Sequence, residues 1–150
     1  MRLQILLTVA SVALSVTAHA ADATSQPEQY LCVVDQSTGF KYNSQLKTWD
    51  ATNFTADKKY ILSVSRKPGD AFKITQVGSK FPVGFCKQGF NESELLFCDM
   101  ISTGEFKFNR VNGRFLLSHP FGYYNVGSSK HFQAEEGNTP YLSIGKCSPI

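Results

Sequence analysis

The cysteines of this chain, together with the segment that precedes them, constrain its fold more than any other feature. Residues 1–20 carry a single basic residue, Arg2, directly after Met1. An apolar run follows and ends in the pattern Ala-His-Ala, as in cleavable export signals. All four cysteines follow this segment, at Cys32, Cys86, Cys98 and Cys147. An even number of cysteines in an exported chain favours two disulfides.

The rest of the chain has the length of one domain. The apolar run near the N-terminus is short and interrupted by Thr and Ser, so it predicts no membrane span and we expect no membrane insertion after cleavage. We expect residues 1–20 to be a signal peptide and residues 21–29 a flexible leader. Residues 30–150 are then a single β domain of a soluble bacterial protein that is periplasmic or secreted.

Short runs rich in Val, Ile, Tyr, Phe and Thr alternate with clusters of Gly, Pro, Asn, Asp and Ser, which is the pattern of strands and turns. No window after the signal peptide has a helical period, so we expect little helix. The predicted fold class is all-β. The predicted strands are 30–35, 39–42, 48–54, 60–65, 71–77, 84–87, 95–101, 104–109, 114–119, 123–126 and 141–147.

Consecutive hairpins favour an antiparallel meander. Asn112-Gly113 is a dipeptide suited to the positive-φ positions of a hairpin turn, and it separates the runs 104–109 and 114–119. A meander of this length must protect its edges, and closure into a small barrel does so. A two-layer β-sandwich is the alternative. Many aromatic residues lie on or beside the predicted strands, and we expect alternate ones to point into the core: Phe40, Tyr42, Trp49, Phe54, Tyr60, Phe72, Phe81, Phe85, Phe90 and Phe97.

The barrel favours one of the three possible disulfide pairings. Its first and last strands are neighbours, which places Cys32 beside Cys147 and leaves Cys86 to pair with Cys98 across a local loop. Pairing Cys32 with Cys86 or with Cys98 would need longer-range contacts, and both alternatives stay open at this stage. A metal or redox site is not favoured, because the sequence has no Cys-x-x-Cys and no histidine at a ligand-like spacing from a cysteine.

The sequence contains no recognisable catalytic motif. His119 and His131 are the histidines after the signal peptide, and neither lies in a hydrolase or metalloprotease signature. We therefore predict that the protein is not an enzyme and uses no cofactor. The net charge is +3, and it falls to +2 when Arg2 is lost with the signal peptide. The basic residues are dispersed, so we expect no binding to nucleic acid.

One long polar segment, from Gly127 to Thr139, differs from the strands around it. In a compact β domain such a loop is either disordered or used for contact. The candidate contact residues are Ser128, Lys130, His131 and Glu135.

Several segments together resemble a group of small secreted proteobacterial proteins of unknown function. They are Tyr30-Leu31-Cys32-Val33, the run 38–43, Trp49, Phe54, the runs 60–62, 96–98, 104–109 and 114–116, and the tail 139–148. The resemblance covers nearly the whole β domain, and the tail is its most specific part. It implies no catalytic residues, because the group has no assigned activity.

The first strand, with its Tyr-x-Cys at residues 30–32, also resembles that of periplasmic lysozyme inhibitors of the MliC type. Those proteins are smaller, and their Ser-Gly and Tyr-x-Cys-x-x-x-Lys motifs are missing here, since the fourth residue after Cys32 is Gln36. The chain also lacks the acidic surface that would suit a basic lysozyme. The leading hypothesis is an exported β domain that binds a protein partner or a small ligand. The alternatives are an inhibitor of a cell-wall enzyme and a small hydrolase.

Overall fold

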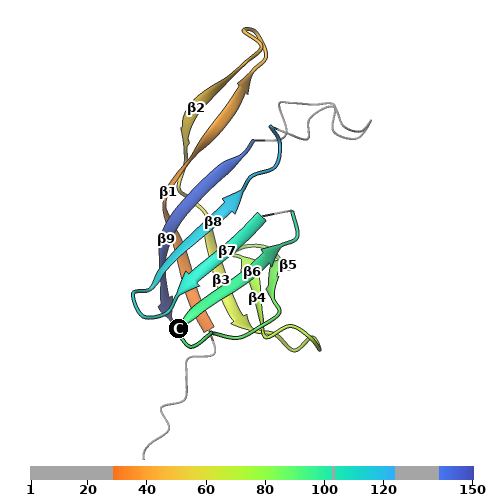
Figure 1. Cartoon of the computed structure of the whole chain (residues 1–150), viewed down its shortest axis with the longest axis vertical. Coiled ribbons are helices and arrows are strands. Elements are labelled where there is room, and N and C mark those ends of the chain that lie inside the picture. Colours follow the sequence, from red (N-terminus) through yellow and green to blue (C-terminus); the bar gives the residue numbers. More distant parts are fainter. Residues whose placement is uncertain (1–28, 103, 124–138) are drawn as a thin grey trace, which may run out of the picture.

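A computed structural model describes residues 29–102, 104–123 and 139–150, and in that part the chain is all β. No described segment forms a helix long and apolar enough to cross a membrane. The sheet has nine strands (Figure 1): β1 (Gln29–Asn43), β2 (Thr48–Phe54), β3 (Lys59–Val64), β4 (Phe72–Gln76), β5 (Pro82–Cys86), β6 (Leu95–Met100), β7 (Gly104–Asn109), β8 (Arg114–His119) and β9 (Tyr141–Pro149).

The strands close into an antiparallel barrel. The order is β2-β1-β3-β4-β5-β6-β7-β8-β9, and a further pairing between β1 and β9 joins the two sides. Eight strands form the closed barrel, and β2 is an additional strand that pairs only with the far half of β1. The predicted closed meander is therefore confirmed. Figure 1 shows the β1–β2 hairpin extending beyond one end of the barrel, while both β1 and β9 reach the other end.

The first strand is longer than the sequence predicts. The predicted strands 30–35 and 39–42 are one continuous strand of 15 residues, because β9 pairs along both parts. A β-bulge at Asp35 separates the pairs Val34–Gly145 and Gln36–Ile144. The bulge shifts the alternation by one residue, so Cys32 and Val34 face inward below it and Ser37 faces inward above it.

Most other predicted strands appear within a few residues of their expected bounds. The turn at Asn112-Gly113 forms as predicted: Gly113 has a φ of 68°, and the Asn112 side chain accepts a hydrogen bond of 2.9 Å from the Arg114 backbone N–H. The predicted strand 123–126 lies outside the described residues except for Tyr123, which is in a bend.

Both disulfides lie inside the barrel and have the pairing that the closed meander predicts. Cys32 bonds to Cys147, directly opposite it across β1 and β9, and Cys86 bonds to Cys98 across β5 and β6. All four cysteines are buried. The two alternative pairings are excluded. Disulfides persist in oxidising compartments, so these bonds indicate an environment outside the cytoplasm.

The barrel interior is a packed core. Phe106 stacks on Phe115 with ring centroids 5.0 Å apart, and Tyr60 meets Phe106 edge-on at 6.5 Å. The fully buried side chains also include Leu62, Ile74, Leu96 and Leu117. Inward packing does not extend to every aromatic residue on or beside a strand: Phe40, Phe81 and Phe97 are exposed by 51%, 77% and 53%.

Candidate functional site

The two ends of the barrel differ, and one of them is filled by an aromatic side chain. The loop between β5 and β6 is held by the Cys86–Cys98 disulfide and carries Phe90. The Phe90 ring packs edge-on against Phe72 at 5.5 Å and Phe108 at 5.8 Å, and Tyr30 lies 6.2 Å away.

A basic residue covers this plug from the outside. The Arg110 guanidinium lies 4.3 Å from the centre of the Phe90 ring and forms an ion pair with Glu94. The loop therefore contributes a hydrophobic closure and a charged pair at the end of the barrel where β1 begins and β9 ends. The opposite end is not closed by this loop.

A cavity of about 340 Å³ occupies the opposite end, near the base of the β1–β2 hairpin. We refer to it as the mouth cavity. Its volume lies at the lower end of the range found for small-molecule sites. Most of its lining residues carry a polar group, beside apolar and aromatic surface. They come from β1, the end of β2, the loop between β2 and β3, β8, and β9 with the residues just before it: Val34, Ser37, Phe54, Thr55, Lys58, His119, Thr139, Tyr141 and Ser143.

The register of three strands assembles the upper layer of the mouth cavity. Gly39, Tyr141 and His119 are directly opposite one another across β1, β9 and β8. The His119 and Tyr141 rings stack with centroids 5.2 Å apart and an angle of 26° between their planes. Glycine is required at position 39, because a Cβ there would collide with the Pro140 carbonyl oxygen and come within 2.8 Å of the Tyr141 Cα.

A layer of hydroxyl groups lies one step deeper. Ser37 and Ser143 are opposite residues of β1 and β9, and their hydroxyl oxygens are joined by a hydrogen bond of 2.9 Å. Ser143 is buried. The bulge at Asp35 makes this pair possible, since without the shift of alternation Ser37 would face outward.

One cation faces the aromatic layer. The Lys58 ammonium lies 5.2 Å from the centre of the Tyr141 ring, in a cation–π contact. Lys58 belongs to the exposed loop between β2 and β3, and its backbone carbonyl accepts a 3.1 Å hydrogen bond from the Val34 N–H. This backbone contact anchors the loop next to the mouth cavity.

The electrostatics of the mouth cavity favour a neutral histidine beside a positive lysine. Burial lowers the pKa of His119 below its ordinary value, and the nearby Lys58 charge lowers it further. Burial also raises the pKa of the Tyr141 hydroxyl, so this group stays protonated at neutral pH. Burial raises the pKa of the Tyr60 hydroxyl, and the neighbouring Tyr141 and the Asp57 carboxylate raise it further.

The cavity supplies one positive charge, aromatic surface and several hydroxyl groups, and no Asp or Glu is among its described lining residues. A carboxylate or phosphate would find a cation at Lys58 and hydrogen-bonding groups around it.

His119 and the serine pair line the same cavity, yet no hydrogen bond within the described ranges joins them. In the same part of the chain, no group of His, Cys, Asp and Glu side chains is arranged to hold a metal ion.

The sequence identified part of this site. Of the two histidines it singled out, His119 lines the mouth cavity, whereas His131 and the other candidate contact residues Ser128, Lys130 and Glu135 lie outside the described residues. Sequence reasoning missed Lys58 and Tyr141. Tyr141 could have been found, because it begins the strand that alternates inward to Cys147.

The fold and its cavity define a small disulfide-linked eight-stranded β-barrel that has a packed core and, at one end, a cavity lined by both aromatic and polar side chains. Comparisons of the chain with protein-family models, with curated proteins and with solved structures find no match.

Proposed function

We propose that this protein is exported to the periplasm or secreted, and that it binds a small anionic ligand in the mouth cavity without transforming it. The ligand carries a carboxylate or phosphate group together with hydroxyl groups. The contact that carries this proposal is the Lys58 ammonium held over Tyr141 and beside His119.

The chemistry of the cavity supports an anion over a cation or a purely apolar ligand. Its only charged described lining residue at neutral pH is Lys58, because the lowered pKa leaves His119 neutral. The neutral imidazole offers one hydrogen-bond donor and one acceptor, and the hydroxyls of Ser37 and Ser143 can do both. These groups suit a ligand that combines one negative charge with hydroxyl groups.

Binding is a better account of the cavity than hydrolysis. A serine hydrolase needs a base hydrogen-bonded to its nucleophile and an acidic residue that orients the base. Here the hydrogen bond of the Ser143 hydroxyl goes to Ser37, and the described lining has no acidic residue to orient His119. The same groups are adequate for holding a polar ligand.

A titration followed by NMR tests the proposal. The probes are glucuronate and glucose, which share a hydroxylated ring and differ in the carboxylate. We expect glucuronate to shift the signals of His119 and Tyr141 and glucose to have little effect. A bound carboxylate would offset the Lys58 charge, so the pKa of His119 should rise towards its ordinary value when glucuronate is bound.

The control is the neighbouring lysine. Lys58→Gln should weaken glucuronate binding by roughly tenfold or more, whereas Lys59→Gln, which changes the next residue along the chain, should leave it unchanged. Equal binding of both sugars, or equal effects of the two substitutions, would contradict the proposal. Ester turnover by the wild-type protein that is lost in His119→Ala would assign the cavity to catalysis instead.

A further inference from the structure

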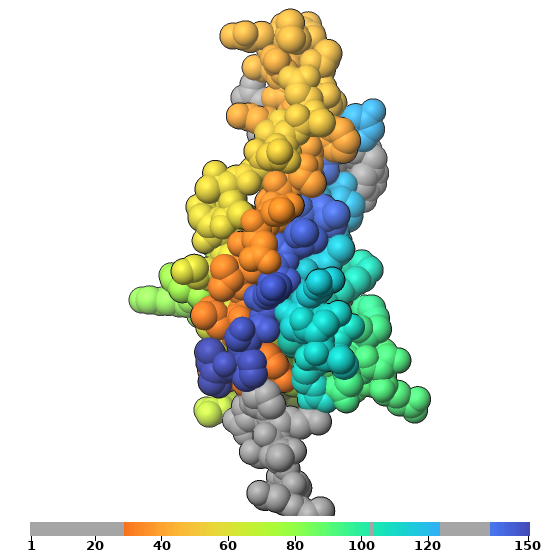
Figure 2. Space-filling view, turned by 90° about the vertical axis from the view of Figure 1, so that its left-hand side faces the viewer, coloured from red at the N-terminus to blue at the C-terminus, as the bar shows by residue number. Residues whose placement is uncertain are grey.

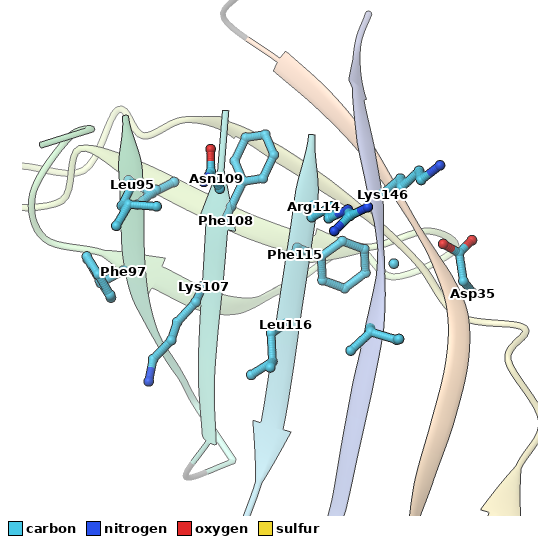
Figure 3. A pocket seen from close by; sticks show the side chains of 13 residues that line it. Asp35, Leu95, Phe97, Lys107, Phe108, Asn109, Arg114, Phe115, Leu116 and Lys146 are labelled. Carbon is cyan, nitrogen blue, oxygen red and sulfur yellow. The ribbon is translucent and has the colours of Figure 1, made fainter. Parts of the chain in front are cut away.

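The outer face of the barrel carries a second cavity, separate from the mouth cavity. It is a groove of about 620 Å³ that crosses β6, β7, β8, β9 and the bulge of β1. We refer to it as the outer groove. Figure 2 shows β1, β9, β8 and β7 side by side on one face of the molecule, and Figure 3 shows the side chains that line the groove.

A row of outward side chains forms the apolar part of the outer groove. Strand register places Phe97 opposite Lys107, Lys107 opposite Leu116, and Leu116 opposite Ile144. Phe97 and Ile144 are exposed by 53% and 45%. The row crosses three strand spacings, about 14 Å in all. This distance is comparable to the length of a medium-chain alkyl tail.

The lysine within this row does not interrupt its apolar character. The Lys107 ammonium pairs with Glu105 at 2.8 Å, and Figure 3 shows the side chain of Lys107 extending along the strand. Its methylene groups therefore lie between Phe97 and Leu116, while its charge is neutralised beside the groove. The apolar row therefore consists of Phe97, the methylene groups of Lys107, Leu116 and Ile144.

Two cations stand at one end of the row. Arg114 on β8 lies directly opposite Lys146 on β9. Each is two residues along its strand from Leu116 or Ile144, and therefore on the same face of the sheet. Like charges in this arrangement repel each other. No ion pair between described residues involves either of them. The Asp35 carboxylate at the β1 bulge also lines the groove; among the described residues it forms no ion pair with either cation, and Figure 3 shows it on the side of β9 away from Arg114. An anionic group placed between Arg114 and Lys146 would reduce their mutual repulsion and form charge-assisted hydrogen bonds to both.

We propose that the outer groove binds a single-chain amphiphile with an anionic head group, such as a fatty-acid carboxylate. The head group lies between Arg114 and Lys146, and the alkyl chain lies along Ile144, Leu116 and Phe97. Charge complementarity at the two cations, combined with the exposed apolar row that begins beside them, supports this assignment. This site is independent of the mouth cavity and of the function proposed for it.

The experiment uses the exported protein and laurate at concentrations where laurate is monomeric. Two further probes separate the contributions: dodecanol has the same chain without the charge, and acetate has the charge without the chain. Calorimetry measures affinity, and two-dimensional NMR locates the site. We expect laurate to bind more tightly than either probe and to shift the backbone signals of Leu116 and Ile144.

Matched variants test the two parts of the site. Arg114→Gln combined with Lys146→Gln should weaken laurate binding by roughly tenfold or more. The same change at two exposed loop lysines that do not line the groove, Lys47→Gln with Lys80→Gln, should have no effect. Ile144→Thr keeps a β-branched residue on the strand and should weaken laurate binding through loss of apolar contact.

Several outcomes would overturn the proposal. They are absence of laurate binding, equal binding of dodecanol, unchanged affinity in the Arg114/Lys146 variant, and NMR shifts confined to the mouth cavity. Binding of an acidic amphipathic peptide in place of laurate would assign the outer groove to a protein partner. Lys58→Gln separates the two proposals, since it should reduce glucuronate binding and leave laurate binding intact.

Discussion

The two disulfides enclose loops of very different length, and this difference gives a quantitative prediction about stability. Cys32–Cys147 links residues 115 apart in the sequence, whereas Cys86–Cys98 links residues 12 apart. In the chain-entropy treatment, a crosslink restricts the unfolded chain more as its loop lengthens. The long loop is then worth about 5 kcal/mol and the short loop about 3 kcal/mol.

The comparison isolates loop length because the two bonds have similar surroundings. The four cysteines are exposed by 6% or less, and each bond joins neighbouring antiparallel strands. Replacing both cysteines of one pair by alanine removes the same atoms in each variant. We therefore expect Cys32→Ala with Cys147→Ala to lose about 2 kcal/mol more stability than Cys86→Ala with Cys98→Ala.

Urea unfolding followed by far-ultraviolet circular dichroism measures both losses against the wild-type protein. If the Cys32/Cys147 variant is unfolded in buffer, the same series in a stabilising osmolyte brings all three proteins into range. Equal losses, or a larger loss in the Cys86/Cys98 variant, would refute the reasoning. Either result would mean that contacts made by the disulfides in the folded barrel outweigh restriction of the unfolded chain.

Three further predictions concern single side chains. The Tyr30 hydroxyl is buried without a described hydrogen-bond partner, so Tyr30→Phe should raise the free energy of unfolding by about 1 kcal/mol in urea titrations. Burial and the Lys58 charge lower the pKa of His119 in the folded protein, so protonation of His119 favours the unfolded chain. The free energy of unfolding should therefore fall as the pH drops below about 6.5. His119→Phe should reduce this pH dependence when unfolding is measured from about pH 7.5 to about pH 5. A Cβ at Gly145 would collide with the Val33 carbonyl oxygen, so Gly145→Ala should lower the thermal midpoint, with a cost of about 1–3 kcal/mol.

The barrel and its disulfides could be predicted because their signals are local and repeated. Strand runs separated by turn residues predict a meander, and a cysteine on both the first and the last strand predicts where the meander closes. The extent of β1 could not be predicted in this way. Residues 36–39 have the composition of a turn, and they stay extended because β9 and β2 pair with them from either side.

The candidate site was only partly predictable, for a similar reason. His119 could be placed inside the barrel from its alternation with Phe115 and Leu117. Lys58 lies in a loop, where no periodicity indicates direction, and its role depends on the backbone hydrogen bond that brings the loop to Val34. Predicting the outer groove would require the register of four neighbouring strands, because that register sets which outward side chains lie side by side. The sequence alone does not specify this register.

The packed interior limits where a ligand can bind. Between the plug at Phe90 and the serine layer, the barrel contains both disulfides and the stacked rings of Phe106 and Phe115. Removing the plug would therefore expose core side chains without opening a channel along the axis. Because the proposed ligand contacts lie in the mouth cavity and on the outer face, substitutions in the core should change stability and leave the selectivity of either proposed site unaltered, provided that the barrel stays folded.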